Sequence, residues 1–183
     1  MTTPISDPVI APVAADLVIC LATELAKVPD PVSEVPRPVC LRPGDRVDLL
    51  LSQTRDECCE GLSWVRMVRI YPSGQQTFPL QDSRVTPCDV LRWAITFELG
   101  AVRCAPTAEP ENLPTCDEWT ESTLNQYDDL AAIRRALCCY QQQNPYRLMA
   151  IDPGEPITTE GGCTGVTMMV TIGAPPCDCL EQS

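Results

Sequence analysis

The stretch VLRWAITFELGAV (residues 90–102) limits the possible folds more than any other part of the chain. Large apolar residues occupy every second position, which is the pattern of a β-strand whose side chains point alternately to opposite faces. The apolar face comprises Leu91, Trp93, Ile95, Phe97 and Leu99, and the opposite face carries Arg92, Thr96 and Glu98. The fold must therefore contain a sheet with one buried face.

Two other segments have helical spacing. In the first, apolar residues recur every three or four positions until Pro29 stops the pattern. They are Val13, Leu17, Cys20, Leu21, Leu25 and Val28. The segment ESTLNQYDDLAAIRRALCCYQQQ (121–143) predicts a second helix, which Pro145 closes. Its expected apolar stripe is Leu124, Tyr127, Leu130, Ala131, Leu137 and Cys138.

Shorter strands are predicted on both sides of the central one. RVDLLL (46–51) and LSWVRMVRIY (62–71) predict a hairpin, and the second strand has one apolar face with Arg66 as an exception. That face comprises Leu62, Trp64, Val68 and Ile70. YRLMAI (146–151), a turn at DPGEP (152–156) and a closing strand follow the second helix. The closing strand should place Val166, Met168, Val170 and Ile172 on one face.

The order of these elements predicts an α+β fold. We expect a small, mostly antiparallel sheet with two helices packed on one face, long loops and extended termini. The proline-rich stretch 29–45 excludes a central strand and favours a stiff connector. We divide the 183 residues into an N-terminal arm (1–12), a single domain (13–173) and a C-terminal tail (174–183).

The charge balance is acidic, with a net charge of −12. Such a charge argues against a nucleic-acid-binding surface, whose affinity comes largely from Lys and Arg neutralising phosphates. It suits either ordinary solubility or a surface past which nucleic acid slides without binding. The N-terminus has no basic residue before Lys27, and no apolar run is long enough to span a membrane. We therefore expect a soluble protein made in the cytoplasm, with no membrane partner.

Twelve cysteines and no histidine set the possible chemistry. No C-x-x-C spacing occurs, adjacent cysteines cannot easily chelate one tetrahedral ion, and no histidine is present to complete a mixed site. We expect no metal and no cofactor. His-based catalysis is excluded, and no phosphate-binding glycine loop or G-x-S-x-G nucleophile motif is present, so we expect no enzyme and no catalytic residue.

Buried free thiols are expected for Cys20 and Cys138, which fall on apolar helix faces. Disulfides are the alternative for the loop cysteines. The candidates are Cys40, Cys58, Cys59, Cys88, Cys104, Cys116, Cys139, Cys163, Cys177 and Cys179. The cytoplasm would keep these thiols reduced, whereas a particle released into an oxidising medium could form the bonds late. Spacing alone does not give the pairing, although Cys177 or Cys179 is a plausible partner for a loop cysteine.

The chain resembles the tail terminator proteins of long-tailed bacteriophages. The resemblance rests on the order of VAADLVICLATELAKV, RVDLLL, LSWVRMVRIY, VLRWAITFELGAVRC, LNQYDDLAAIRRALCCY and EPITTEGGCTGVTMMVTI. It covers roughly residues 13–173 and carries no diagnostic motif. The cysteine count and the long loops 72–87 and 104–119 depart from a minimal member of the family, and they leave the position in the neck open.

The resemblance implies a structural virion protein of the head–tail neck, assembled in the host cytoplasm. Such proteins form a hexameric ring that caps the tail tube and ends its polymerisation. The ring joins the tube to the head–tail connector, or stopper, protein and leaves a lumen for transiting DNA. Candidate ring-docking positions in the first long loop are Gln75, Gln76, Phe78, Asp82 and Arg84.

Three other hypotheses stay open. Within the same class, the chain could be another phage neck or tube protein. In a different class, it could be a cytoplasmic cysteine-rich module that binds metal or does redox work. A secreted, disulfide-stabilised domain is the third, and the missing signal segment argues against it.

Overall fold

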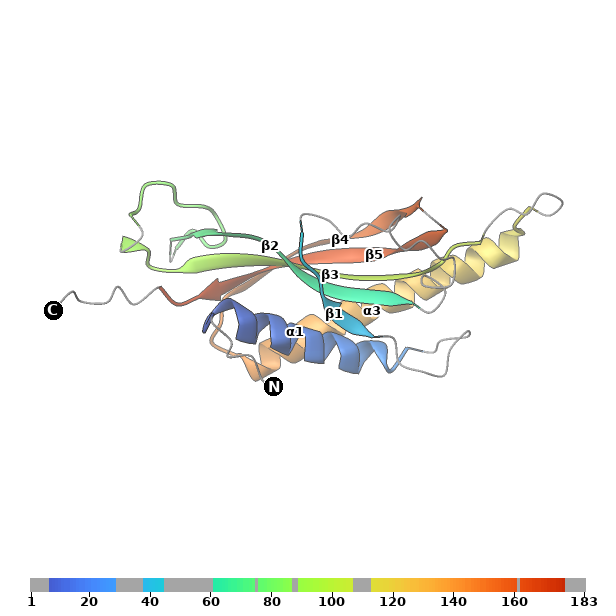
Figure 1. The fold of residues 1–183 in the computed structure, drawn as a ribbon, viewed down its shortest axis with the longest axis horizontal. Helices are drawn as coiled ribbons and strands as arrows, with labels where there is room; N and C mark the ends of the chain where they lie inside the picture. Colours follow the sequence, from blue (N-terminus) through green and yellow to red (C-terminus); the bar gives the residue numbers. More distant parts are fainter. Residues whose placement is uncertain are drawn as a thin grey trace.

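The computed structural model describes residues 7–28, 38–44, 61–74, 76–86, 89–106, 113–160 and 162–176. These residues form two helices and a five-stranded sheet (Figure 1). Along the chain they are α1 (Ile10–Leu25), β1 (Val39–Leu41), β2 (Leu62–Pro72), β3 (Trp93–Cys104), α3 (Cys116–Gln143), β4 (Met149–Glu160) and β5 (Cys163–Ala174). The predicted strand 46–51 lies outside the described residues.

The sheet has the order β1-β2-β3-β5-β4 and is antiparallel except where β1 pairs with β2. Both helices lie on the same face of the sheet, side by side (Figure 1). The predicted α+β class is therefore confirmed. The described part of the proline-rich stretch, residues 38–44, contains the three-residue edge strand β1, which agrees with the exclusion of a central strand there.

The main core lies between the helices and the sheet. All six residues of the predicted α1 stripe are buried, as are Ile95, Phe97 and Leu99 of β3. The predicted apolar face of β5 is buried in the same core. The helix begins at Ile10 rather than Val13, because the Asp7 side chain accepts hydrogen bonds from the backbone N–H groups of Val9 and Ile10. Such capping satisfies donors that the first helical turn leaves unpaired.

The other face of the sheet is also buried, which the alternation in β3 did not predict. Thr96 and Glu98 of β3 are buried, and the Thr96 hydroxyl is 3.0 Å from that of Thr171 in β5. Leu91, expected on the apolar face, precedes the strand and is 62% exposed. A second, smaller cluster on this face comprises Trp64, Val102 and Cys163.

The predicted face of β2 was wrong. Trp64 lies away from the helices, opposite Gly100, and Arg66 shares its face as expected, but Ile70 pairs with Ile95 on the opposite face. A Cβ atom at Gly100 would come within 2.2 Å of the Trp64 ring, so only glycine fits beneath the indole. A bulge between Met67 and Arg69 then reverses which positions face the helices, and no single alternating face runs through the strand.

The predicted α3 stripe was also largely wrong. The helix begins at Cys116, within the stretch expected to be a loop, at a capping box in which Thr115 and Glu118 bond each other's backbone N–H groups. Its buried residues are Asp129, Ala132, Ile133, Ala136, Leu137 and Tyr140. Of the expected stripe only Leu137 is buried, whereas Leu124, Tyr127 and Cys138 are exposed. The small side chains Ala132 and Ala136 allow close packing without a strong apolar signal.

The segment DPGEP is not a turn but part of β4. Register shifts between Ile151 and Gly154, and between Ile157 and Glu160, absorb its proline and glycine residues. The chain reverses instead between the paired residues Glu160 and Cys163, where Gly162 adopts a φ of 81°. This positive φ favours glycine, which adopts it without a steric clash of a Cβ atom.

Candidate functional site

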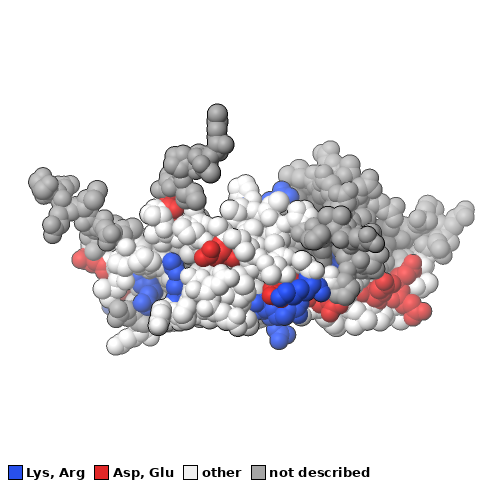
Figure 2. All heavy atoms as spheres, turned by 90° about the horizontal axis from the view of Figure 1, so that it is seen from below, with Lys and Arg blue, Asp and Glu red and all other residues white. Residues whose placement is uncertain are grey.

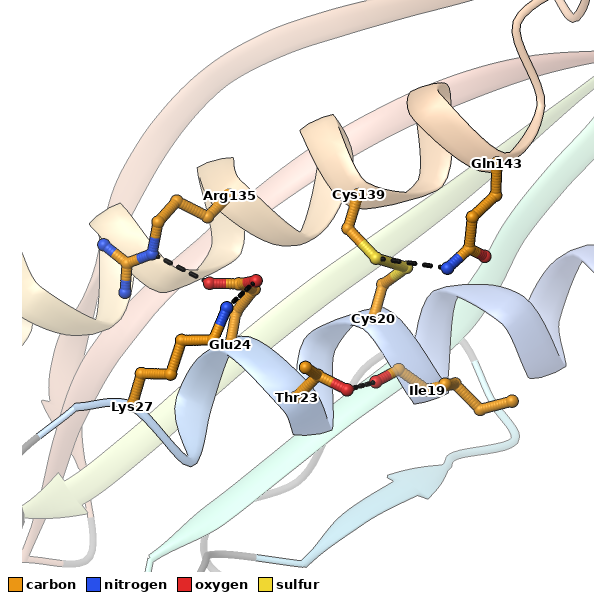
Figure 3. A network of polar contacts seen from close by, with 8 residues as sticks. All are labelled: Ile19, Cys20, Thr23, Glu24, Lys27, Arg135, Cys139 and Gln143. Carbon is orange, nitrogen blue, oxygen red and sulfur yellow. Dashed lines mark hydrogen bonds and ion pairs between the residues drawn. A yellow bond between two sulfur atoms is a disulfide. The ribbon is translucent and has the colours of Figure 1, made fainter.

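A disulfide joins the two helices. Cys20 of α1 and Cys139 of α3 are bonded, with Cα atoms 5.8 Å apart and a sequence separation of 119 (Figure 3). Cys139 was a disulfide candidate, but Cys20 was expected to be a buried free thiol, and that expectation was wrong. The α1 stripe packs directly on α3, which brings the two sulfur atoms together.

The remaining described cysteines fall into two groups. Cys104 and Cys163, both disulfide candidates, are each in a disulfide. Cys40 and Cys116, also candidates, are instead free thiols, because each lies at an exposed position and no described cysteine is bonded to it. Cys138, expected to be buried, is likewise an exposed free thiol, because it lies on the outward face of α3. The candidates Cys58, Cys59, Cys88, Cys177 and Cys179 lie outside the described residues.

A charged cluster beside the disulfide ties the same two helices together (Figure 3). Glu24 is only 7% exposed, and its carboxylate accepts hydrogen bonds from Lys27 at 2.5 Å and from Arg135 of α3 at 3.0 Å. The hydrogen bond from Lys27 lowers the Glu24 pKa most. Burial acts in the opposite direction, and Arg135 lowers the pKa further. The cluster is suited to holding helices rather than to proton transfer.

Two more buried ion pairs organise the sheet. Arg66 donates two hydrogen bonds to Glu98, at 2.7 and 2.6 Å, and Trp64 Nε1 donates to the same carboxylate at 2.8 Å. Arg103, near the end of β3, donates two hydrogen bonds to the fully buried Asp129 of α3, at 2.8 and 2.9 Å. The second pair fixes the point at which α3 meets the sheet.

The predicted docking loop is anchored to the end of β2. The Tyr71 hydroxyl donates to the Pro79 carbonyl, and the Ser73 hydroxyl donates to that of Leu80. Of the five candidate positions, Gln76 and Arg84 are exposed, Phe78 and Asp82 are half-buried, and Gln75 lies outside the described residues. Leu80, which the sequence did not single out, is 67% exposed on this loop.

Within the described residues, no group of three or more His, Cys, Asp or Glu side chains is placed to hold a metal ion. None of the helices in the described part combines the length and apolar character needed to cross a membrane. The notable surfaces are apolar ones.

One apolar surface lies on the first half of α3, which the sequence had assigned partly to a loop. Leu113 just before the helix is 78% exposed, and Trp119, Leu124 and Tyr127 are 45%, 56% and 63% exposed. Leu124 and Tyr127 had been assigned to the core. Their three-residue spacing does indicate a common face, but not whether that face is buried.

A second apolar surface is a groove between α1 and the β1–β2 edge, with a volume of about 440 Å³. Its walls include Ile10 and Ala14 of α1, Leu41 of β1 and Met67 of β2, with Phe97 also lining it. Leu41 and Met67 are 56% and 43% exposed. The sequence could not reveal the groove, because its walls come from four separate elements.

Comparison with known proteins adds no assignment: no protein-family model and no curated protein matches the chain.

Proposed function

We propose that the protein is a structural virion protein, a tail terminator of a long-tailed bacteriophage. In this role it forms a hexameric ring that caps the tail tube, ends its polymerisation and joins it to the head–tail connector. DNA passes through the lumen as cargo, and the protein performs no catalysis. The ring assembles in the host cytoplasm and remains in the neck of the virion.

The observation that supports the proposal best is the arrangement of the elements. The amphipathic helix, central strands, second helix and closing hairpin on which the resemblance rests fold into one sheet with both helices on one face. Fold alone does not imply function, so this support is an analogy at the level of architecture.

Three further properties fit the role. A ring needs two different, complementary surfaces on each subunit, and the chain carries two different apolar surfaces, the exposed face of α3 and the α1/β1–β2 groove. The net charge of −12 would keep a lumen from holding DNA during ejection. The disulfides suit a particle that leaves the cytoplasm for an oxidising medium.

The test is to add the purified protein to polymerising tail tube protein of the same virus and to image the tubes by negative stain. We expect shorter tubes with a ring of six subunits at one end. The variant Arg84→Glu in the loop should weaken capping, whereas Arg134→Glu on the outward helix surface serves as a charge-matched control. Tubes that keep their length and carry no added density at either end would contradict the proposal.

The cysteine-rich binding module is the alternative from another class. Its main support is that three of the described cysteines, Cys40, Cys116 and Cys138, are exposed free thiols. Metal content after purification without oxygen distinguishes it, because stoichiometric zinc would favour the module over the neck protein.

A further inference from the structure

The first part of α3 has an unusual environment for a helix in a small domain. Its buried residues begin only at Asp129, so residues 116–128, here called the α3 extension, contain none. Figure 1 shows these turns running past the end of the strands. They amount to roughly three and a half turns, and isolated helices of this length are marginal in water. The extension is supported by its capping box, by the anchor at Asp129 and by a hydrogen bond from Gln126 to Thr164.

The extension nevertheless carries large apolar side chains toward solvent. Trp119, Leu124 and Tyr127 lie on its outward half, and Leu113 precedes them. Scattered exposed apolar residues are normal on soluble proteins, but a cluster on one short helix is typical of an interaction surface. An apolar helix face laid into an apolar groove is a common mode of recognition.

The same chain offers a groove of suitable size and character. A volume of about 440 Å³ is within the range of roughly 300–1,000 Å³ that holds a small organic ligand, so one or two large side chains fit. The exposed Leu41 and Met67 form part of its wall and would be covered by an inserted helix.

Charge also favours this pairing. The extension carries Asp117, Glu121 and Asp128, all exposed, and acidic side chains gather at the end of the molecule where α3 begins (Figure 2). The groove is bordered by the exposed Arg42. Asp7 lies on the same rim, but its carboxylate already accepts two backbone N–H groups of α1. Opposite charges at the edge of an interface steer association and fix its orientation.

We propose that the α3 extension of one copy docks into the α1/β1–β2 groove of a second copy. The extension and the groove are different patches, so the contact is heterologous and repeats head to tail instead of closing a two-fold dimer. This contact would be the one between neighbouring subunits of the proposed ring. The number of subunits at which the ring closes rests on the proposed function.

The test uses the full chain and sedimentation equilibrium. We expect the wild-type protein to associate as its concentration rises. Leu124→Asp in the extension and Met67→Asp in the groove should each weaken association and raise the dissociation constant roughly thirtyfold. Ile19→Asp, on the exposed surface of α1, is the matched control and should associate like wild type. If Met67→Asp fails to fold, Leu41→Asp replaces it at the same groove.

Mixing the two variants gives the sharpest result. A copy with a damaged extension still has an intact groove, and the other copy has the reverse, so the mixture should form dimers and nothing larger. A same-patch contact would not be rescued by mixing. Dimers absent from the mixture while wild type associates would therefore overturn the proposal.

The native thiols report the geometry independently. Cys116 lies at the start of the extension, and Cys40 directly precedes Leu41 of the groove wall in the edge strand β1. A short bismaleimide should link Cys116 of one copy to Cys40 of another, and Leu124→Asp should abolish the link. Links between two Cys116 residues alone would overturn the proposal.

Failure here is distinguishable from failure of the proposed function. A wild-type protein that stays monomeric at its highest soluble concentration, or larger species that persist unchanged in both variants, would overturn the docking contact. The tube-capping experiment is measured separately, so its result would still test the proposed function.

Discussion

Glu24 is a carboxylate on the apolar stripe of α1, where a charge is tolerated only because Lys27 and Arg135 bind it. Its pKa is lowered, first by the hydrogen bond from Lys27. A group whose folded pKa is depressed stabilises the protein above its unfolded pKa and loses that contribution as pH falls through the folded value. The window of loss therefore starts near the ordinary Glu pKa of about 4.3 and extends downward.

Glu24→Gln should thus lower the free energy of unfolding by about 1 kcal/mol at pH 7, because both cations lose their charged partner. Urea unfolding at pH 7 and near pH 3 measures the difference. The difference in free energy of unfolding between variant and wild type should be smaller at the acidic pH. Glu155→Gln, at an exposed position, is the control, and a gap that stays constant with pH would contradict this account.

The Cys20–Cys139 disulfide should contribute to the free energy of unfolding. Replacing both residues with alanine should cost about 2–4 kcal/mol, because the bond restricts a long loop of the unfolded chain. Peptide mapping under non-reducing conditions identifies the bond, and denaturant unfolding measures the loss. Cys40→Ser and Cys116→Ser, at exposed free thiols, should each stay within about 0.5 kcal/mol of wild type.

A substitution at Tyr140 should raise the stability of the protein, whereas the preceding ones lower it. Its hydroxyl is buried without a hydrogen-bond partner among the described residues, and burial raises its pKa. Leaving a buried hydroxyl unpaired costs about 1–3 kcal/mol, so Tyr140→Phe should raise stability by about 1 kcal/mol. A thermal midpoint that falls would show that the hydroxyl has a partner in solution.

At the scale of elements, the α3 extension should be the least protected part of the helix. It has few buried contacts, so local hydrogen bonds such as those of the capping box determine how easily its turns unfold. Thr115→Ala should cost the first turns about 1 kcal/mol.

Hydrogen exchange read out peptide by peptide tests this expectation. Amides in residues 117–121 of Thr115→Ala should exchange about fivefold faster, since 1 kcal/mol corresponds to that factor. Amides near Ile133 and Leu137 should be unchanged and serve as the internal control. Equal acceleration along the whole helix would mean that the extension opens only with the core.

The elements also show how far a pattern can predict structure. The stripe of α1 and the apolar faces of β3 and β5 were predicted because large side chains recur at one period on a buried face. The face of α3 was not, because its buried side contains Ala132, Ala136 and the paired Asp129 while its exposed side carries Leu124 and Tyr127. Hydrophobicity is a guide to burial only where the partner surface is known.

The candidate site was less predictable than the fold. The partner of Cys139 depends on how α1 packs against α3, which is a long-range contact with no local signal. The groove likewise exists only after four elements meet. Bulges in β2 and β4 shift side chains between faces, and a single sequence does not mark where they occur.

At the scale of the whole molecule, the net charge of −12 predicts weak contact with DNA. Nucleic-acid affinity depends on cations that neutralise phosphates, so the protein should not retard duplex DNA in a gel at physiological salt. A basic protein of similar mass is the positive control. Tight, salt-sensitive binding would contradict the proposal that DNA passes the protein surface without binding to it.

The two edges of the sheet carry a further consequence for the proposed ring. β1 offers only three residues for pairing, while β4 is interrupted by two register shifts and contains Pro153 and Pro156. Proline, bulges and short strands at an edge prevent a neighbouring chain from adding a strand. Copies crowded together would therefore meet through side chains rather than through continuous backbone ladders, which protects a crowded assembly against fibrous aggregation.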